Sequence, residues 1–252
     1  SIRSRPGISS VRYPPVQGLI YRSDASRGHQ TGSHPEAAER IVAVEAELDR
    51  LDWLGYERRE SEPASDEMLL RAHPQSHLET VRAACADSAS LDADTVVVPA
   101  SWDAALHAAG GAAAVAEALC KGSAEVGASL HRPPGHHAEA ARAMGFCLFN
   151  NVAVAALHAI EACGLDRVLI LDWDVHHGTG PRQFSPKIRA SVSSRSTSIR
   201  ATREPAPRAI MVLVKEPVSQ SIARSRREAE TGCSLVWSSN SSGRWSSSIG
   251  LN

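Results

Sequence analysis

Apolar residues along the first 180 positions recur in two patterns, one helical and one continuous. In the stretch 34–51, Ile41, Val44 and Leu48 recur at near-helical spacing, and Ser33 can cap this helix. The same reasoning predicts strands at 18–21, 126–130 and 167–171 and helices at 34–51, 66–84, 101–119 and 151–163. Continuous apolar runs are typical of strands buried on both faces. Helices alternating with such strands predict an α/β fold with a mainly parallel sheet.

Composition places the chain among globular proteins. It has 252 residues, of which 42% are hydrophobic, enough for one sizeable core. No apolar run reaches the roughly 18 residues of a membrane-spanning helix, and residues 1–17, without the apolar stretch of a secretory signal, are expected to form a loose arm. The five cysteines are odd in number and include no Cys-x-x-Cys pair. A cytoplasmic location without disulfides is therefore expected.

Four of the eleven histidines form two adjacent pairs, at 136–137 and 176–177, each after a predicted strand. Sites in open α/β sheets form beyond the carboxyl ends of strands, so both pairs are expected to face one cleft. Asp174 and His176, two positions apart at a strand end, project to the same side and can bind one cation such as zinc. Asp172 lies one step deeper, where it could orient a histidine. Either pattern alone is more often structural, but the combination favours a metal site whose third ligand comes from elsewhere.

Three longer motifs carry a resemblance to a known family. The segments RPPGHHA at 132–138, GFCLFNN at 145–151 and LDWDVHHG at 171–178 resemble the signatures of histone deacetylases and acetylpolyamine amidohydrolases. Supporting segments are TGSHPE at 31–36, LRAH at 70–73 and SWDAA at 101–105. The likeness extends over about residues 18–180. It implies the three-layer, arginase-like α/β sandwich of that family and the hydrolysis of an acetyl-lysine-like or acetylpolyamine amide.

The resemblance also implies a role for each motif residue. His136 would be the general base, and His137 its partner as electrostatic stabiliser or general acid. Asp174 and His176 would bind zinc, with ferrous iron as the alternative metal. A metal lowers the pKa of its bound water towards ~7, and a histidine titrating near ~6.5 suits the proton relay. Nearby carboxylates are expected to raise the pKa of such a histidine.

Two further roles and one contrast follow from the same resemblance. Asp172 would hydrogen-bond His136 and help to bind a structural potassium ion, and Phe146 would form one wall of the substrate channel. Arginase-like relatives with two manganese ions carry a carboxylate two residues after the ligand histidine. Gly178 occupies that place here. A site with a single catalytic metal is therefore expected.

Two groups that the family uses are missing from the later part of this chain. The implied third zinc ligand is an aspartate, and a tyrosine near the end of the domain would polarise the acetyl carbonyl. No aspartate follows Asp174, and the three tyrosines are Tyr13, Tyr21 and Tyr56. The sequence after position 180 supplies neither group.

We interpret residues 181–252 as a tail translated out of frame. This stretch holds 17 serines and 12 basic residues against 4 glutamates and no aspartate. When codons are regrouped by one base, with degenerate bases left free, residues 192–197, 201–206 and 211–220 can encode FVSLH, YPGTG and GAGKGTGFT, strings that the family carries here in this order. Apart from the apolar run 210–214, the tail is expected to be irregular and non-homologous.

Three functional hypotheses follow. The first is an active deacetylase acting on an acetylated lysine-like or polyamine substrate. The second is a truncated, catalytically inactive remnant of such an enzyme that retains at most weak metal binding. The third is a nucleic-acid-binding protein with a basic tail, which the lack of aromatic residues among the basic ones disfavours. The oligomeric state stays open.

Of the seven histidines outside the paired motifs, five fall in segments for which a role can be predicted. His73, His107 and His158 fall within predicted helices and are expected to be structural. His29 and His34 fall in a loop and at a helix start, in the segment that edges the site in the resembling family. Either of these two could contribute to the site.

Overall fold

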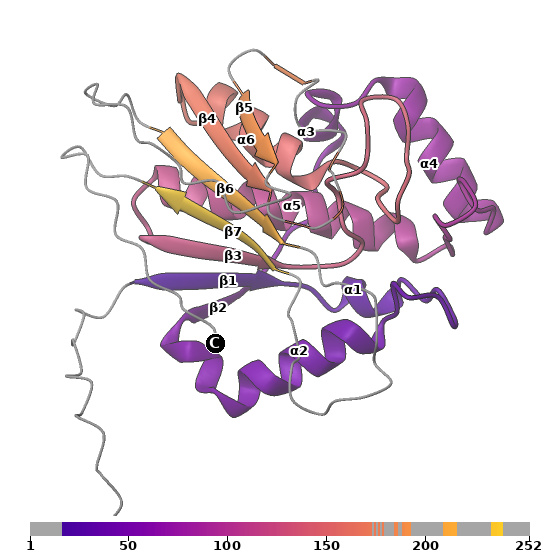
Figure 1. Ribbon diagram of the computed structural model, residues 1–252, viewed down its shortest axis with the longest axis horizontal. Helices are drawn as coiled ribbons and strands as arrows, with labels where there is room; N and C mark the ends of the chain where they lie inside the picture. The colour runs from indigo at the N-terminus through magenta and orange to yellow at the C-terminus, as the bar shows by residue number, and fades with distance from the viewer. Residues whose placement is uncertain are drawn as a thin grey trace, which may run out of the picture.

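A seven-stranded sheet forms the centre of the molecule (Figure 1). The computed structural model describes residues 17–172, 174, 176, 178, 184–185, 188–192, 209–215 and 233–238, with backbone alone at 189–192, 209–215 and 233–238. The strands are β1 (Gly18–Arg22), β2 (Glu57–Glu60), β3 (Val126–Leu130), β4 (Arg167–Asp172), β5 (Ile188–Val192), β6 (Ala209–Lys215) and β7 (Cys233–Ser238). Their order is β2-β1-β3-β7-β6-β4-β5. Among these strands β7 alone pairs antiparallel with its neighbours, so the prediction of a mainly parallel sheet is confirmed.

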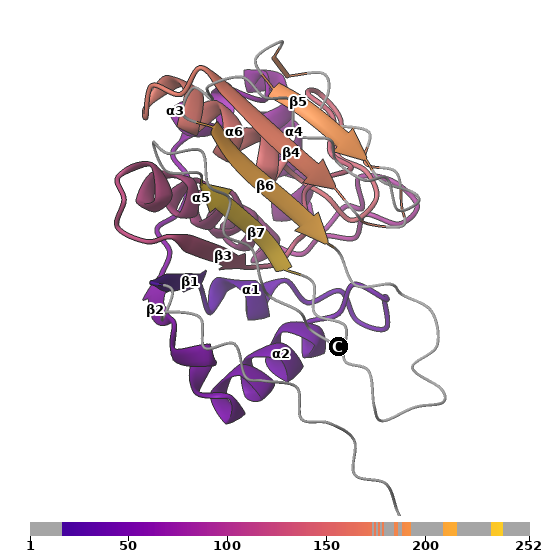
Figure 2. The ribbon, with the colours of Figure 1, turned by 60° about the vertical axis from the view of Figure 1, so that its left-hand side comes forward.

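Helices cover both faces of the sheet. They are α1 (Ala25–Gly28), α2 (Glu39–Arg50), α3 (Asp66–Leu70), α4 (Gln75–Asp87), α5 (Ser101–Cys120) and α6 (Asn151–Glu161), with a 3-10 turn η1 (Asp52–Gly55) after α2. In β1, Leu19 belongs to the larger core under α5 and α6, whereas Ile20 packs with Ile41 of α2. In Figure 2, β4, β6 and β7 lie in front of α5 and α6, whereas α2 lies below β1 and β2. The result is a three-layer α/β sandwich.

The alanine-rich helix α5 packs closely because it lacks large side chains where its neighbours approach. A Cβ added at Gly110 would lie 2.2 Å from the carbonyl oxygen of Glu62, and one at Gly111 would lie 2.3 Å from the ring of His131. Alanine at either position would therefore force α5 away from these neighbours.

Two of the predicted helices differ most from the structure. The predicted helix 66–84 is divided into α3 and α4, because Pro74 lacks an amide donor and stands in extended conformation as the N-cap of α4. The predicted helix 34–51 begins only at Glu39, with Ala38 rather than Ser33 at its N-cap. The residues before it form a loop that is held by side-chain and backbone bonds of Glu36.

Several elements were not predicted. The short helix α1 falls between the predicted elements. The charged sequence of β2 (ERRE) shows no apolar pattern, because β2 is a largely exposed edge strand. Beyond residue 180, where an irregular tail was expected, the backbone forms β5, β6 and β7. The apolar run 210–214 lies within β6, which pairs with β4 and β7. The proposed division at 180 and the out-of-frame origin of the tail stay predictions.

Candidate active site

The loop after β3 is packed tightly against the start of α6. A Cβ added at Gly135 would lie 2.6 Å from the backbone nitrogen of Asn151. The side-chain amide of Asn151 donates to the carbonyl of Pro133 at 3.2 Å. Glycine is needed here because the backbone approaches another backbone closely. This packing fixes the segment immediately before His136.

His136 and Asp172 form a buried pair at the carboxyl ends of β3 and β4. Nδ1 of His136 lies 2.9 Å from Oδ2 of Asp172, and their side chains are 1% and 0% exposed. A carboxylate can only accept, so the proton of the neutral ring resides on Nδ1 and Nε2 has the lone pair. The other oxygen of Asp172 accepts the backbone N–H of Asp174 at 3.1 Å. Asp172 therefore orients both the histidine and the segment that follows β4.

Asp174 bonds to His176 as Asp172 bonds to Asp174, with each carboxylate accepting the backbone N–H two residues later. Oδ1 of Asp174 accepts the backbone N–H of His176 at 2.7 Å and lies 2.9 Å from its Nδ1. The carboxylate is fully buried, whereas the His176 side chain is 57% exposed. These two side chains meet, as expected from their spacing. His177, the last histidine of the motif, lies outside the described residues.

Gly178 packs directly against the His136–Asp172 pair. A Cβ at this position would lie 2.5 Å from Oδ2 of Asp172 and 3.1 Å from Nδ1 of His136. Any side chain here would push into the carboxylate or the ring. A carboxylate two residues after His176, as in the two-manganese relatives, therefore does not fit beside this pair.

His137 lies between the two groups. Its ring centroid is 4.0 Å from that of His136 and 6.2 Å from that of His176. Burial, and then the neighbouring His136 and His176, lower the pKa of His137 to about 4, although Asp174 and Asp172 act in the opposite direction. The carboxylates thus act on His137 in the expected upward direction, but burial and repulsion by the neighbouring histidines outweigh them.

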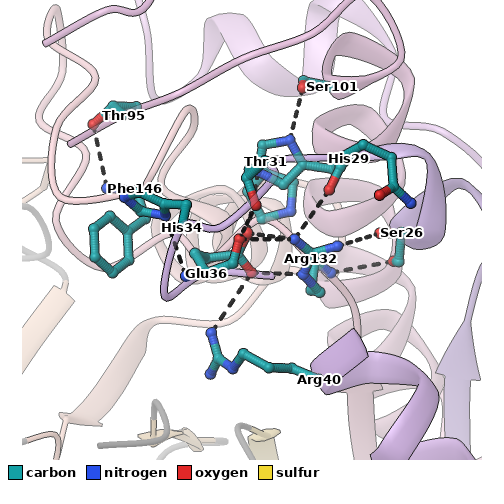
Figure 3. Close-up of polar contacts among 12 residues, drawn as sticks. Ser26, His29, Thr31, His34, Glu36, Arg40, Thr95, Ser101, Arg132 and Phe146 are labelled. Atoms are coloured by element: carbon teal, nitrogen blue, oxygen red, sulfur yellow. Dashed lines mark hydrogen bonds and ion pairs between the residues drawn. The ribbon is translucent and has the colours of Figure 1, made fainter. Parts of the chain in front are cut away.

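Phe146 is held in an unusual backbone conformation beside His137. Its φ is 69°, and the preceding Gly145 packs so closely that a Cβ there would lie 2.8 Å from the His137 ring. The backbone N–H of Phe146 donates to Oγ1 of Thr95 at 3.2 Å. The ring of His34 meets the Phe146 ring edge-to-face, with centroids 4.6 Å apart (Figure 3). Phe146 thus has a second ring beside it, from a segment 112 positions earlier in the chain.

Comparison with known proteins identifies the family. The model of the histone deacetylase domain matches residues 34–190, more than half of the chain. This chain belongs to the histone deacetylase family. It is 42% identical to the histone deacetylase-like amidohydrolase of Pseudomonas aeruginosa, in an alignment that covers 66% of this chain and 43% of that protein. It is 38% identical to the polyamine deacetylase HDAC10 of Homo sapiens, covering 64% of this chain and 26% of that protein.

A solved structure supports the fold of this histone deacetylase family member. The HD domain of HDA15 superposes with a TM-score of 0.66 at 31% identity, covering 71% of this chain and 54% of that chain. The resemblance and the fold class expected from the sequence are confirmed. The chain spans less than half the length of the two curated relatives above. Among the described residues no helix is both long and apolar enough to cross a membrane.

The donor atoms of this deacetylase-family site fit part of a zinc site. Ligands at ~2.0–2.1 Å in tetrahedral geometry stand ~3.3 Å apart, close to the 2.9 Å between Oδ1 of Asp174 and Nδ1 of His176. Both atoms are of the kind that zinc or ferrous iron accepts. A catalytic zinc takes three protein ligands, and the described residues contain no group of three or more suitable side chains. The fit therefore extends to two positions.

Sequence reasoning missed the residues that support the site. Thr95 was not singled out, and no motif marks it. Arg132 opens the RPPGHHA motif but was not given a role, although its buried pair with Glu36 is visible in Figure 3. Glu36 falls in the quoted TGSHPE segment.

Proposed function

We propose that this chain is a metal-dependent deacetylase that hydrolyses the acetyl amide of a lysine-like or polyamine substrate. The observation that carries the proposal is the buried His136–Asp172 pair. Asp172 also accepts the backbone N–H of Asp174, and the carboxylate of Asp174 contacts His176. The family membership and the relatives that are named amidohydrolase and polyamine deacetylase support this class of reaction.

In this proposal His136 is the general base. Asp172 keeps the proton on Nδ1, so Nε2 is the atom that receives a proton from the attacking water. The buried carboxylate also stabilises the imidazolium that forms. His137, whose pKa lies at about 4, stays neutral at neutral pH and acts as a hydrogen-bonding partner of the reacting groups.

Asp174 and His176 are the residues that would hold the metal, zinc or ferrous iron, and Asp172 would also face a structural potassium ion. When bound, the catalytic metal would supply a polarised water at neutral pH. To hold the ion through Nδ1, the neutral His176 ring would carry its one proton on Nε2.

Phe146 and His34 would together form one wall beside the arm of the substrate. Two flat rings at 84° to each other offer an apolar wall for a chain of methylene groups. An acetylated lysine side chain and an acetylated polyamine share such an arm. The substrate class is therefore an acetylated primary amine on a flexible alkyl chain, and a cytoplasmic location suits either form.

One observation favours a second candidate, a catalytically inactive remnant. No aspartate follows Asp174 in the given sequence, so these residues do not supply the third ligand that the resemblance implies, and no tyrosine follows Tyr56. Loss of one donor to the developing oxyanion typically costs ~10²–10³ in rate. The basic tail that motivated a nucleic-acid-binding hypothesis lies mostly outside the described residues.

The test is an assay of the full chain with zinc or ferrous iron, using an acetyl-lysine peptide and an acetylated polyamine. Turnover that falls ~10²–10⁴-fold in His136→Asn, but not in the matched variant His107→Asn, supports the proposal. Metal binding by calorimetry without turnover of either substrate identifies the remnant. No measurable metal binding and no turnover would refute both.

A further inference from the structure

A second buried charge pair lies near the site, between Arg132 and Glu36. Nε of Arg132 donates to one carboxylate oxygen of Glu36 at 2.6 Å, and Nη2 donates to the other at 2.5 Å (Figure 3). The two side chains are 5% and 1% exposed. Such a two-point pairing has a fixed geometry that a lysine cannot reproduce.

The remaining donors of Arg132 hold the backbone of the segment before Glu36. Nη1 donates to the carbonyl of Ser26 at 2.7 Å, and Nη2 also reaches the carbonyls of His29 at 3.1 Å and Glu36 at 3.2 Å. The guanidinium thus replaces the hydrogen bonds that regular structure would provide in this loop.

Glu36 is bonded at every polar atom. Its carboxylate also contacts Nε2 of His29 at 3.2 Å and Nη1 of Arg40 at 3.6 Å. Its carbonyl accepts a hydrogen bond from the Thr31 hydroxyl, and its backbone N–H donates to Nδ1 of His34 at 3.2 Å. Burial alone would raise the pKa of Glu36, but the hydrogen bonds from His29 and Arg132 lower it to about 2. The carboxylate therefore stays charged at all physiological pH values.

This network connects two places in the proposed site. Glu36 stands two residues after His34, whose ring meets Phe146, and Arg132 stands four residues before His136. His29 extends the network to Oγ of Ser101 at 2.7 Å, at the start of α5. The position of His34 relative to Phe146 therefore depends on a bond between two segments about 100 residues apart.

We propose that Arg132 and Glu36 are positioning residues that fix the segment 29–36 against the loop that carries His136 and His137, so that the His34 ring lies beside Phe146 and extends the wall of the substrate channel. This inference rests on the proposed function for its meaning, because the channel is that of the deacetylase. His136 itself is also held by Asp172 and Gly178, so loss of the pair should affect substrate binding more than the chemical step.

The matched control is another buried arginine–glutamate pair. Arg22 donates to Glu45 at 2.7 Å, and their side chains are 9% and 6% exposed. Arg22 ends β1, and the side chains of Arg22 and Glu45 bond to Asp24, Arg27 and Glu60 rather than to His34 or Phe146. Arg22→Lys should therefore lower the melting temperature as Arg132→Lys does, without moving the channel wall.

The experiment compares Arg132→Lys, Glu36→Gln and Arg22→Lys by NMR of histidine-labelled full chain. His34 is identified by His34→Asn, and Phe146→Leu gives the shift of the His34 ring signals without the neighbouring ring current. We expect Arg132→Lys and Glu36→Gln to move these signals at least half of the way to the Phe146→Leu reference, and Arg22→Lys to leave them in place. If Arg132→Lys does not fold, the isosteric Glu36→Gln carries the test.

In an active preparation the same variants should raise KM about tenfold with kcat within about twofold, because uniform binding is lost. Unchanged His34 signals in Glu36→Gln and Arg132→Lys, with only a loss of stability, would overturn the proposal. So would equal losses in kcat and in kcat/KM with KM unchanged. The NMR test needs no turnover, so a chain without activity refutes the proposed function and still decides whether the pair positions His34.

Discussion

Acidification from pH 7 to pH 5 should destabilise the folded chain by about 2 kcal/mol through His73 alone. This side chain is 1% exposed. Its Nε2 accepts the backbone N–H of Asn150 at 3.0 Å, so Nδ1 carries the proton and donates to the carbonyl of Ala140 at 2.9 Å. Burial lowers the pKa of His73 to about 4. A second proton on Nε2 would face the N–H of Asn150 and break that bond.

The magnitude follows from linkage between protonation and folding. The unfolded histidine titrates near ~6.5, whereas the folded one titrates at about 4. Between these values the unfolded state binds more protons, so the free energy of unfolding falls as the pH falls. At pH 5 the difference is about 1.5 pKa units, or about 2 kcal/mol, and below pH 4 it levels off at about 3 kcal/mol. Carboxylates with lowered pKa values contribute their own loss only below about pH 4.5, so the two effects separate.

The assay is urea denaturation at pH 7 and pH 5, in the original chain and in His73→Gln, whose amide oxygen can still accept from Asn150. The variant will be less stable at pH 7, but its decrease on going to pH 5 should be smaller by about 2 kcal/mol. Side-chain ¹⁵N signals should report a neutral His73 in the folded chain at pH 5. A folded His73 that titrates near pH 6.5, or an equal decrease in both chains, would show that burial does not control this group.

Three further predictions concern the site and its support. Gly178→Ala places a Cβ 2.5 Å from Asp172 and should abolish the bond to His136, which NMR of the His136 ring would report. Asp172→Asn should reduce kcat ~10²–10⁴-fold because His136 loses its fixed tautomer, and an unchanged kcat would refute that role. Asn150→Ala removes the cap of α6 and the bond to the carbonyl of Ala138, so urea denaturation should show a loss of about 2–3 kcal/mol; a loss below 0.5 kcal/mol would contradict the assigned bonds.

The strands and the site motifs were predictable because local pattern and function agree there. The run 167–171 reads as a buried strand, and β4 ends at Asp172, where the motif begins. The spacing of Asp174 and His176 predicts that they share one side, and their side chains do meet. These features depend on residues close together in the sequence.

The hydrogen bonds between Arg132 and the loop around Glu36 were not predictable in the same way. The helix expected from 34 starts at Glu39, because Glu36 is drawn into a pair with Arg132, 96 positions later. Propensity and capping rules describe only local contacts and cannot weigh such a bond. The charged strand β2 was missed for a related reason: its pairing with β1 is made by backbone groups, which every sequence has.

The carboxyl ends of three parallel strands each have a buried charged side chain bonded to a partner from another segment. Arg22 at the end of β1 pairs with Glu45, and Arg132 just after β3 pairs with Glu36. Because arginine keeps its proton at any ordinary pH, these pairs can only hold structure in place. Asp172 at the end of β4 pairs instead with a histidine, which, unlike the two arginines, can exchange a proton near neutral pH. A buried charged pair thus holds the structure in place at the ends of β1 and β3 and takes part in the proposed chemistry at the end of β4. The difference is that the basic member of the pair is arginine in the first two cases and histidine in the third.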